Sequence, residues 1–439
     1  MRLHRFFPRV SRLALGVYYR FERAGATVPE RGPVLVVANH PNSLLDPAAV
    51  CAVARRPVRF LAKAPLFSEP GLGWIMRACG AIPVYRRQDN PTLMHRNDEA
   101  FRAAHETLAG GSAVGIFPEG TSHSEPALVP LKTGAARIAL GAARLRRCGF
   151  PIVPVGLVLR HKERFRSRAL VVVGEPVPWG DLAGAGPEEE EAVRELTGRI
   201  ERALREVTLN LESWEDAPVV ECVEAIYAAE LELPRDRAER VRRLGRVSEA
   251  LVRLRRSQPE RLAPLYRLVA RYADLLAQLG LRPHRVGSAP PPAAVFGWTV
   301  RQVAFFVLLA PLAAAGHLLF FLPYRITGLL PRRAGVERDV QSTYKVLGGI
   351  LVYGTWILLL ATLAGWRLGT WAGLLTALLL PALAFLTLVV RDRWTGARAN
   401  ARSYLLLRGR AQLQRRLLER RRELAERLEA LRRELDGSG

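Results

Sequence analysis

The sequence predicts an α/β domain with a mostly parallel sheet flanked by helices, followed by soluble helices and a C-terminal helical membrane region. Between residues 21 and 186, short apolar runs alternate with segments of helical periodicity, and this alternation is typical of parallel sheets. From residue 302 onward, three long stretches contain no Lys, Arg, Asp or Glu. A membrane span needs about 20 mainly apolar residues, so the two halves of the chain suit different environments.

The predicted strands of the α/β domain are short and apolar. The run from Val34 to Val37 is apolar at every position, which is typical of a strand buried on both faces. We predict strands over Pro33 to Ala38, Val58 to Leu61, Ala81 to Tyr85, Ala113 to Phe117, Ile152 to Leu159 and Leu170 to Val173. Helical periodicity between them predicts helices over Leu44 to Ala54, Gly73 to Ala78, Met94 to Ala109 and Thr133 to Arg146.

Residues 1–20 predict an amphipathic helix on a membrane surface, ahead of the α/β domain at 21–186. Basic and apolar side chains alternate along it: Arg2, Arg5, Phe6, Phe7, Arg9, Val10, Arg12 and Leu13. Such a helix can lie on an anionic bilayer. The alternative is an ordinary N-terminal helix packed on the domain.

The remainder of the chain divides into three predicted regions. Residues 187–287 lose the strand signal and predict a linker domain of two to four soluble helices. In the membrane region, 293–390, the stretches 346–366 and 368–390 predict two transmembrane helices joined by a tight turn after Arg367. Residues 391–439 predict a basic cytoplasmic helix that packs on the enzyme or rests at the membrane surface.

The first uncharged stretch, 302–324, is interrupted by Pro311, His317 and Pro323. If it crosses, the arginines that follow it face the opposite side from the arginine-rich tail, against the positive-inside tendency. A re-entrant or interfacial segment that returns near Pro311 keeps both basic regions in the cytoplasm. We therefore expect 302–324 not to cross.

The amino-acid composition indicates which classes of partner the chain is expected to bind. The chain has 65 Lys and Arg against 41 Asp and Glu, a net charge of +24, which favours an anionic partner such as membrane lipid or a phosphorylated substrate. The basic residues are spread over helices and membrane flanks without an aromatic–basic motif, so nucleic acid is not expected. The 4 cysteines have no zinc or disulfide spacing, and a reducing compartment is the default.

A histidine and an aspartate directly follow the first buried strand. The segment Asn39 to Asp46 begins where that strand ends, and functional residues gather at the strand ends of α/β sheets. A carboxylate near a histidine can accept one ring N–H, fix the tautomer and stabilise the imidazolium. No serine or cysteine elbow motif accompanies the pair, so a substrate hydroxyl is the expected nucleophile. A structural histidine that caps a helix is the alternative.

Two other strand ends carry charged residues. The segment Gly80 to Arg87 ends in two arginines, and a strand-end arginine can hold a phosphate with forked hydrogen bonds. The segment Phe117 to Ser122 sets Glu119 beside a glycine and two hydroxyls, which suits the binding of substrate hydroxyl groups. Lys132, at a helix start, makes a second anion site. Solvated charges and plain turns are the alternatives for each segment alone.

Together these motifs resemble the glycerophospholipid acyltransferase family, the group of glycerol-phosphate and lysophosphatidate acyltransferases. The likeness in order, spacing and residue identity extends over residues 34–174. It implies the glycerolipid acyltransferase fold, a catalytic dyad of His40 and Asp46, and an acceptor phosphate on Arg86. The other residues expected to bind substrate are Asn39, Glu119, Gly120, Thr121, Lys132 and Pro154. Pro154 would lie near the acyl channel.

One departure from the family pattern is the spacing of the dyad. Five residues separate His40 from Asp46, whereas the family motif has four. On a continuous helix one extra residue would turn Asp46 by about 100°, so the insertion must be absorbed before the helix, with Asn42 or Ser43 as its cap. A similar spacing occurs in a branch that includes fungal glycerol-3-phosphate acyltransferases, which also have a hydrophobic C-terminal region.

The resemblance implies a membrane-bound acyltransferase of phospholipid biosynthesis. It would transfer a fatty acyl group from acyl-CoA or acyl-carrier protein to glycerol 3-phosphate or lysophosphatidate, without a metal or bound cofactor. The catalytic domain is expected in the cytoplasm, at a bacterial inner membrane, in contact with anionic lipids. The alternatives are a phospholipid transacylase or lipid hydrolase that uses the same dyad, and a non-catalytic membrane scaffold.

Overall fold

The computed structural model describes residues 5–86, 91–234, 236–281, 283, 286, 292–409 and 411–436. Contacts divide the chain into two compact units. The first unit comprises Met1–Asn210, Asp236–Gly245 and Val336–Val346. The second comprises Leu211–Arg235, Arg246–Gly335 and Leu347–Gly439. The first unit therefore includes a short segment from far along the sequence.

The first unit is built on a seven-stranded sheet with the order β1-β7-β6-β2-β5-β3-β4. Its strand pairs are parallel except for the antiparallel pair of β6 and β7. The predicted fold class is thus confirmed. The strands are β1 (Arg20–Gly25), β2 (Val34–Ala38), β3 (Val58–Lys63), β4 (Ile82–Val84), β5 (Ala113–Ile116), β6 (Ile152–Val158) and β7 (Arg168–Val173).

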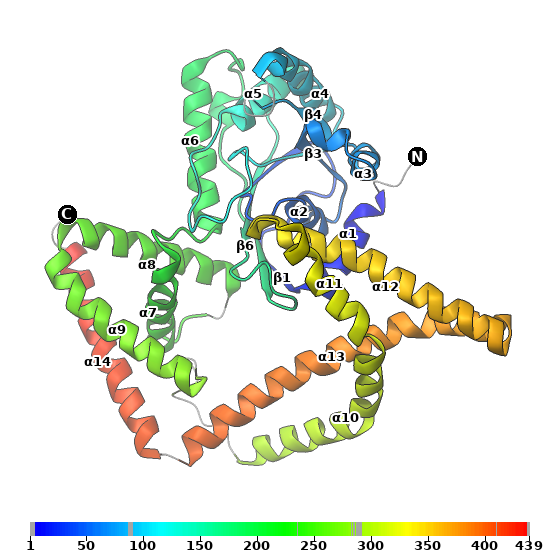
Figure 1. Ribbon diagram of the computed structural model, residues 1–439. Helices are drawn as coiled ribbons and strands as arrows, with labels where there is room; N and C mark the ends of the chain where they lie inside the picture. The colour runs from blue at the N-terminus through cyan, green and yellow to red at the C-terminus, as the bar shows by residue number, and fades with distance from the viewer. Residues whose placement is uncertain are drawn as a thin grey trace. The chain divides into compact units, whose positions relative to one another are not determined.

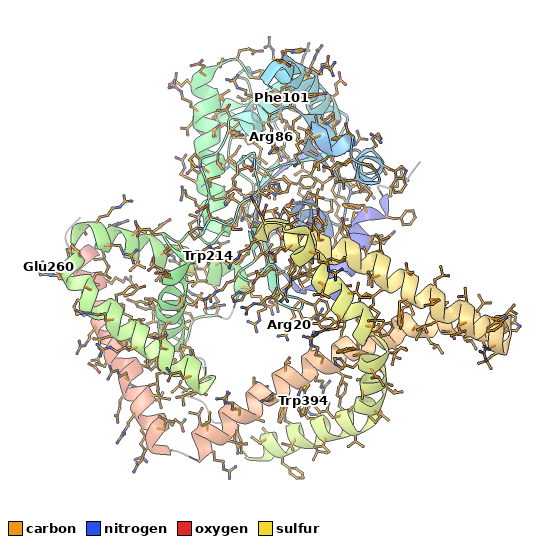
Figure 2. The ribbon with its side chains drawn as sticks, in the orientation of Figure 1. Arg20, Arg86, Phe101, Trp214, Glu260 and Trp394 are labelled. Carbon is orange, nitrogen blue, oxygen red and sulfur yellow. The ribbon has the colours of Figure 1, made fainter. Side chains whose placement is uncertain are left out.

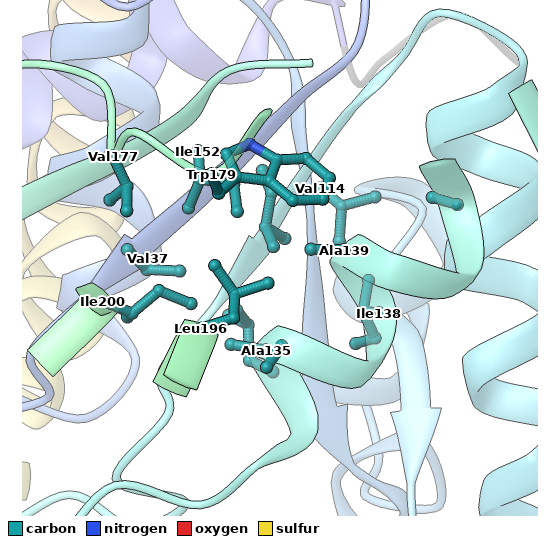
Figure 3. Close-up of a cluster of buried hydrophobic side chains, with 14 of the residues drawn as sticks. Val37, Val114, Ala135, Ile138, Ala139, Ile152, Val177, Trp179, Leu196 and Ile200 are labelled. Atoms are coloured by element: carbon teal, nitrogen blue, oxygen red, sulfur yellow. The ribbon is translucent and has the colours of Figure 1, made fainter. Parts of the chain in front are cut away.

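Helices cover both faces of the sheet, and the alternation along β2 shows how. Leu35 and Val37 pack into a cluster with α4, α5 and α6, whereas Val34 and Val36 pack into one with α1 and α2. Because successive strand residues point to opposite faces, the run Val34–Ala38 is apolar throughout. Figure 3 shows Trp179, Leu196 and Ile200 in the first cluster. The helices are α1 (Phe7–Tyr18), α2 (Leu45–Ala54), α3 (Leu72–Ala78), α4 (Asn97–Ala109), α5 (Gly134–Arg146) and α6 (Glu190–Val207).

Three elements differ from the expectation. The edge strand β1, at residues 20–25, was not predicted, because its polar sequence RFERAG lacks a strand pattern and it forms by pairing with β7. Residues 187–210 belong to the first unit rather than to the linker, since α6 buries Val193, Leu196 and Ile200 there. The helix predicted from Met94 begins at Asn97 after a 3-10 turn.

The second unit is helical. After α6, the segment predicted as a linker contains the helices α7 (Ala217–Glu230), α8 (Arg237–Ser257) and α9 (Pro259–Leu279). The tail helix α14 (Ala411–Asp436) buries Leu417 and Leu424 in one cluster with Val219 of α7 and Val269 of α9. The tail thus packs on helices of the second unit that precede α10.

Among the described residues, three helices are long and apolar enough to cross a membrane: α10 (Pro292–Leu319), α12 (Arg338–Leu368) and α13 (Thr370–Arg408). Figure 1 shows α12 and α13 meeting in a tight turn, where Gly369 has a φ of 96°. The expected turn after Arg367 is therefore present. The segment 287–291, which separates the linker from this region, lies outside the described residues.

The expected return of the chain near Pro311 is wrong. Helix α10 continues through Pro311 to Leu319, and the break comes at Phe320, before α11 (Phe321–Ala334). A proline removes one backbone hydrogen bond, yet its neighbours in α10 stay helical. The position of the break was therefore not readable from the proline.

Candidate active site

The dyad residues lie together where β2 ends. His40 Nδ1 is 2.8 Å from Asp46 Oδ2, and Asp46 sits fully buried in the first turn of α2. The His40 ring is stacked on Phe117, with centroids 4.1 Å apart, and its side chain stays 19% exposed. An imidazole with one nitrogen held by a carboxylate and one edge open to solvent can act as a general base.

The extra residue between His40 and Asp46 is absorbed before the helix, as the sequence predicts. Ser43 takes a φ of 50°, in the left-handed region, and α2 begins only at Leu45. The predicted cap is wrong, because Leu44 occupies the N-cap position without a side-chain hydrogen bond. The Asn42 side chain instead donates to the Tyr19 hydroxyl at 2.9 Å.

Hydrogen bonds and charge surround the buried carboxylate. Besides His40, Asp46 Oδ2 accepts the Asn42 backbone N–H at 2.6 Å. Burial raises the pKa of Asp46 above its ordinary value, while the hydrogen bonds from His40 and Asn42 and the nearby Lys162 ammonium act in the opposite direction. Lys162 is itself buried and donates to the backbone carbonyls of Pro41 and His123. The carboxylate is therefore fixed in place and oriented toward His40.

A second carboxylate supports His40 from the other side. Glu119 is 2% exposed, and its Oε2 accepts the His40 backbone N–H at 2.7 Å. Its Oε1 lies 3.0 Å from His123 Nε2. The bond to Glu119 raises the pKa of His123. The predicted contact of Glu119 with an acceptor remains a prediction, and in this structure both of its oxygens face protein groups.

Two cations converge on the loop after β5. Arg86, labelled in Figure 2, lies beyond the end of β4 and donates to the Gly120 carbonyl at 3.4 Å. Gly120 has a φ of 73°, and a Cβ there would stand 2.6 Å from Lys132 Nζ. Because Gly120 adjoins Glu119, the two cations lie near the dyad and could hold an anionic group. Arg87, the second arginine of that motif, lies outside the described residues.

The remaining predicted substrate-binding residues are placed differently. Thr121 is exposed on the same loop as Gly120. The Asn39 amide is held by β6, because its Oδ1 accepts the Leu157 N–H at 2.7 Å and its Nδ2 donates to the Leu157 carbonyl at 3.1 Å. Pro154 is buried within β6 against Gly174. The structure does not bring the Asn39 and Pro154 side chains to the His40 ring, and their roles stay predictions.

Sequence reasoning missed three residues of this site: Tyr19, Lys162 and His123. Tyr19, whose pKa burial raises, donates to the Lys162 carbonyl at 2.7 Å, and His123 lies beside Glu119. The only sequence signal among these was the four-residue spacing from Glu119 to His123. In the described part of the chain, no group of three His, Cys, Asp or Glu side chains could hold a metal ion.

Comparison with known proteins adds an independent observation. A family model described as Acyltransferase matches residues 20–158. Glycerol-3-phosphate O-acyltransferase 2 of Saccharomyces cerevisiae is 29% identical over 275 residues, which cover 60% of this chain and 36% of that protein. The 1-acyl-sn-glycerol-3-phosphate acyltransferase of Bacillus subtilis is 30% identical over 159 residues, covering 35% of this chain and 71% of that protein.

A solved structure also matches. The crystal structure of the 1-acyl-sn-glycerophosphate acyltransferase PlsC from Thermotoga maritima aligns with a TM-score of 0.35 and 23% identity, over 46% of this chain and 77% of that one. The chain spans about a third of the length of the yeast relatives that it matches.

Proposed function

Since the chain belongs to the acyltransferase family that includes the glycerol-3-phosphate and 1-acylglycerol-3-phosphate acyltransferases, we propose that it transfers a fatty acyl group to a hydroxyl of a glycerol-phosphate acceptor. The donor is a thioester, acyl-CoA or acyl-carrier protein. The observation that carries the proposal is the 2.8 Å pairing of a partly exposed His40 with a fully buried Asp46. This pair supplies a base, while the acceptor supplies the nucleophile.

The reaction follows from the geometry of the pair. As the acceptor oxygen attacks the thioester carbonyl, His40 Nε2 takes its proton, and a tetrahedral intermediate forms. Asp46 holds the Nδ1–H tautomer and stabilises the imidazolium. Collapse of the intermediate breaks the carbon–sulfur bond, and the departing thiolate takes the proton back from His40. The proposed reaction uses no metal or bound cofactor.

The acceptor phosphate is proposed to bind between Arg86 and Lys132. Both cations lie against Gly120, one residue from the carboxylate that holds the His40 backbone. A phosphate placed there would bring the glycerol hydroxyls toward the dyad. The yeast relatives, which match more of this chain than the Bacillus protein does, are named for glycerol 3-phosphate, so we propose that acceptor first and lysophosphatidate second.

The test combines an acceptor assay with an Arg86 variant. Membranes containing the enzyme are given labelled acyl-CoA or acyl-carrier protein with glycerol 3-phosphate or lysophosphatidate. A forked phosphate contact contributes about 1.5–3 kcal/mol, so Arg86→Ala should raise the apparent acceptor KM roughly ten- to a hundredfold. The donor KM should change little. Arg86→Lys should recover part, because a point charge replaces the fork.

The control for this variant is Arg77→Ala, which removes an exposed arginine that also donates to a backbone carbonyl, that of Phe67 at 2.9 Å. It should leave the acceptor KM unchanged. If Arg87→Ala raises the acceptor KM more than Arg86→Ala does, the phosphate binds to Arg87 and not to Arg86. Product formation without a thioester would favour a transacylase or hydrolase. Unchanged cellular lipid composition after replacement of His40 would favour a scaffold.

The three apolar helices indicate membrane association, and we propose that the catalytic unit faces the cytoplasm, at a bacterial inner membrane. The segment Val336–Val346 belongs to the catalytic unit, and the tail packs on helices that precede α10. The chain must therefore be on the catalytic unit's side of the membrane at residue 336, and again after α13. These contacts support a hairpin of α12 and α13 and oppose a single crossing by α10.

A re-entrant pair of α10 and α11 agrees with the contacts within the second unit. The Phe320 ring, at the break, stacks on Tyr353 with centroids 5.7 Å apart, and Trp356 donates to the Leu319 carbonyl at 3.2 Å. Trp356 lies ten residues after Val346, about 15 Å along a helix, which is half of a roughly 30 Å hydrocarbon core. The pair would thus reach the middle of the bilayer and return.

Topology can be measured with single cysteines near Arg333, Gly369 and Ala430, after removal of the native cysteines. In sealed cells, an impermeant reagent should label only the Gly369 position, because the hairpin exposes its turn outside while the arginine-rich flanks stay inside. Labelling at Ala430 with protection at Gly369 would mean three crossings or an inverted hairpin. Labelling at Arg333 would mean that α10 crosses.

A further inference from the structure

The start of helix α12 is part of the catalytic unit. Its segment Val336–Val346 groups with the sheet domain, and three polar side chains in it are almost fully buried: Asp339, Ser342 and Thr343. Buried polar groups in folded proteins are normally hydrogen-bonded, and the proposed function assigns no role to these side chains. The partners of Ser342 and Asp339 are informative, because one lies on the loop between His40 and Asp46 and the other on the loop whose Glu119 holds the His40 backbone.

Ser342 bonds to the turn between the dyad residues. Its hydroxyl donates to Asn42 Oδ1, while the other end of that amide donates to Tyr19 at 2.9 Å. The side chain of Asn42 is thereby held from both ends, and its backbone N–H points at Asp46 Oδ2, 2.6 Å away. Ser43 next to it adopts a left-handed conformation, and the side-chain contacts of Asn42 add to the backbone bonds of this turn, which run from the Leu45 and Asp46 N–H groups to the Asn42 and Ser43 carbonyls.

Asp339 and Lys345 bond to two neighbouring loops. Asp339 Oδ2 accepts the Ser122 hydroxyl at 2.5 Å, on the loop whose Glu119 holds the His40 backbone. Lys345 Nζ donates to the Glu163 carbonyl at 2.5 Å, next to Lys162. About two turns of helix therefore contact three loops, those of Asn42, Ser122 and Glu163.

We propose that Ser342 and Asp339 are positioning residues of the acyltransferase. Both lie in the N-terminal part of α12, and they hold the loops of His40 and Glu119 in the geometry that the reaction needs. This inference rests on the proposed function of the dyad. The uncharged stretch of α12 begins at Val346, four residues after Ser342. Four residues of helix are about 6 Å long. The network therefore holds the dyad close to the bilayer surface, where a lysophospholipid acceptor or product resides.

The test compares two hydroxyl deletions on the same buried helix turn. Ser342→Ala removes the bond to Asn42, whereas Thr343→Val removes a buried hydroxyl that has no hydrogen-bond partner among the described residues. We expect Ser342→Ala to lower kcat about tenfold, the effect of one lost hydrogen bond, with both KM values within twofold. Ser342→Cys, with a weak S–H donor, should be intermediate, and Thr343→Val should match wild type.

The unfolding midpoint, measured beside kcat and KM, separates positioning from loss of fold. If the dyad loosens, kcat should fall in Ser342→Ala while both KM values and the thermal unfolding midpoint stay close to those of Thr343→Val. A variant that is merely partly unfolded would instead show a lowered unfolding midpoint. If Ser342→Ala does not fold, Asp339→Asn takes its place, and the same fall in kcat is expected.

The two proposals fail in different ways. If the wild-type enzyme shows no thioester-dependent transfer, the proposed function is wrong whatever the variants do. If the wild type is active, and Ser342→Ala or its replacement has the kcat of Thr343→Val, the positioning role is wrong while the function stands.

Discussion

Replacement of His40 by alanine should reduce acyl transfer by at least about a hundredfold, the usual contribution of a general base. The ring is the only part of His40 that is lost, because the bonds to Glu119 and His123 come from the His40 backbone. The domain should therefore stay folded. Turnover is measured with saturating acceptor and thioester, and folding is measured by the thermal unfolding midpoint in detergent.

Two other histidines serve as controls for this prediction. His161 is exposed, so His161→Ala should keep full activity. His123 lies beside Glu119 and is a second histidine near the dyad, so His123→Ala tests it as an alternative base and should lose less activity than His40→Ala. Near-normal turnover in a folded His40→Ala enzyme, together with an inactive His123→Ala enzyme, would move the base to His123.

Replacement of Asp46 by asparagine should also cost at least about a hundredfold in kcat. The amide offers one acceptor oxygen, which the Asn42 N–H can take, and its NH2 group then faces His40 Nδ1. The imidazole is forced into the tautomer that carries its proton on Nε2, and in that form it cannot accept a proton from the acceptor. The negative charge that stabilises the imidazolium is lost as well.

The same substitution should not destabilise the fold at neutral pH. Burial raises the pKa of Asp46, so the folded state binds this proton more tightly than the unfolded state does. The stability contributed by the protonated carboxyl is complete below the unfolded pKa of about 4 and is lost as the pH rises through the folded pKa. Asparagine cannot ionise, so the unfolding midpoint of Asp46→Asn should equal or exceed that of wild type at pH 7.

The difference in midpoint should shrink as the pH approaches 4. The control is Asp181→Asn: this exposed aspartate pairs with Arg199 at 2.6 Å, which lowers its pKa, and its loss should leave transfer intact without raising the midpoint. A strongly lowered midpoint in Asp46→Asn at pH 7 would show that the carboxylate is needed for folding, and the activity loss could not then be assigned to orientation.

The sheet and the dyad could be predicted from the sequence because their signals are local. The apolar run of β2 reflects burial on both faces, and His40 and Asp46 are close along the chain. Even the absorption of the extra residue before α2 followed from helix geometry. The strand β1 was missed because its polar residues are held in place by β7, about 150 residues away.

What the sequence by itself determined is the α/β domain, the helical membrane region, and the motif residues His40, Asp46, Arg86 and Glu119. Only the tertiary structure decided what surrounds them. The hydroxyl of Ser342 reaches Asn42 across 300 residues, and Tyr19 and Lys162 reach the same turn from two further elements. Serine, tyrosine and lysine carry no periodicity or motif at those positions. Their role depends on which loops the folded chain brings together, and that is set by packing over the whole unit.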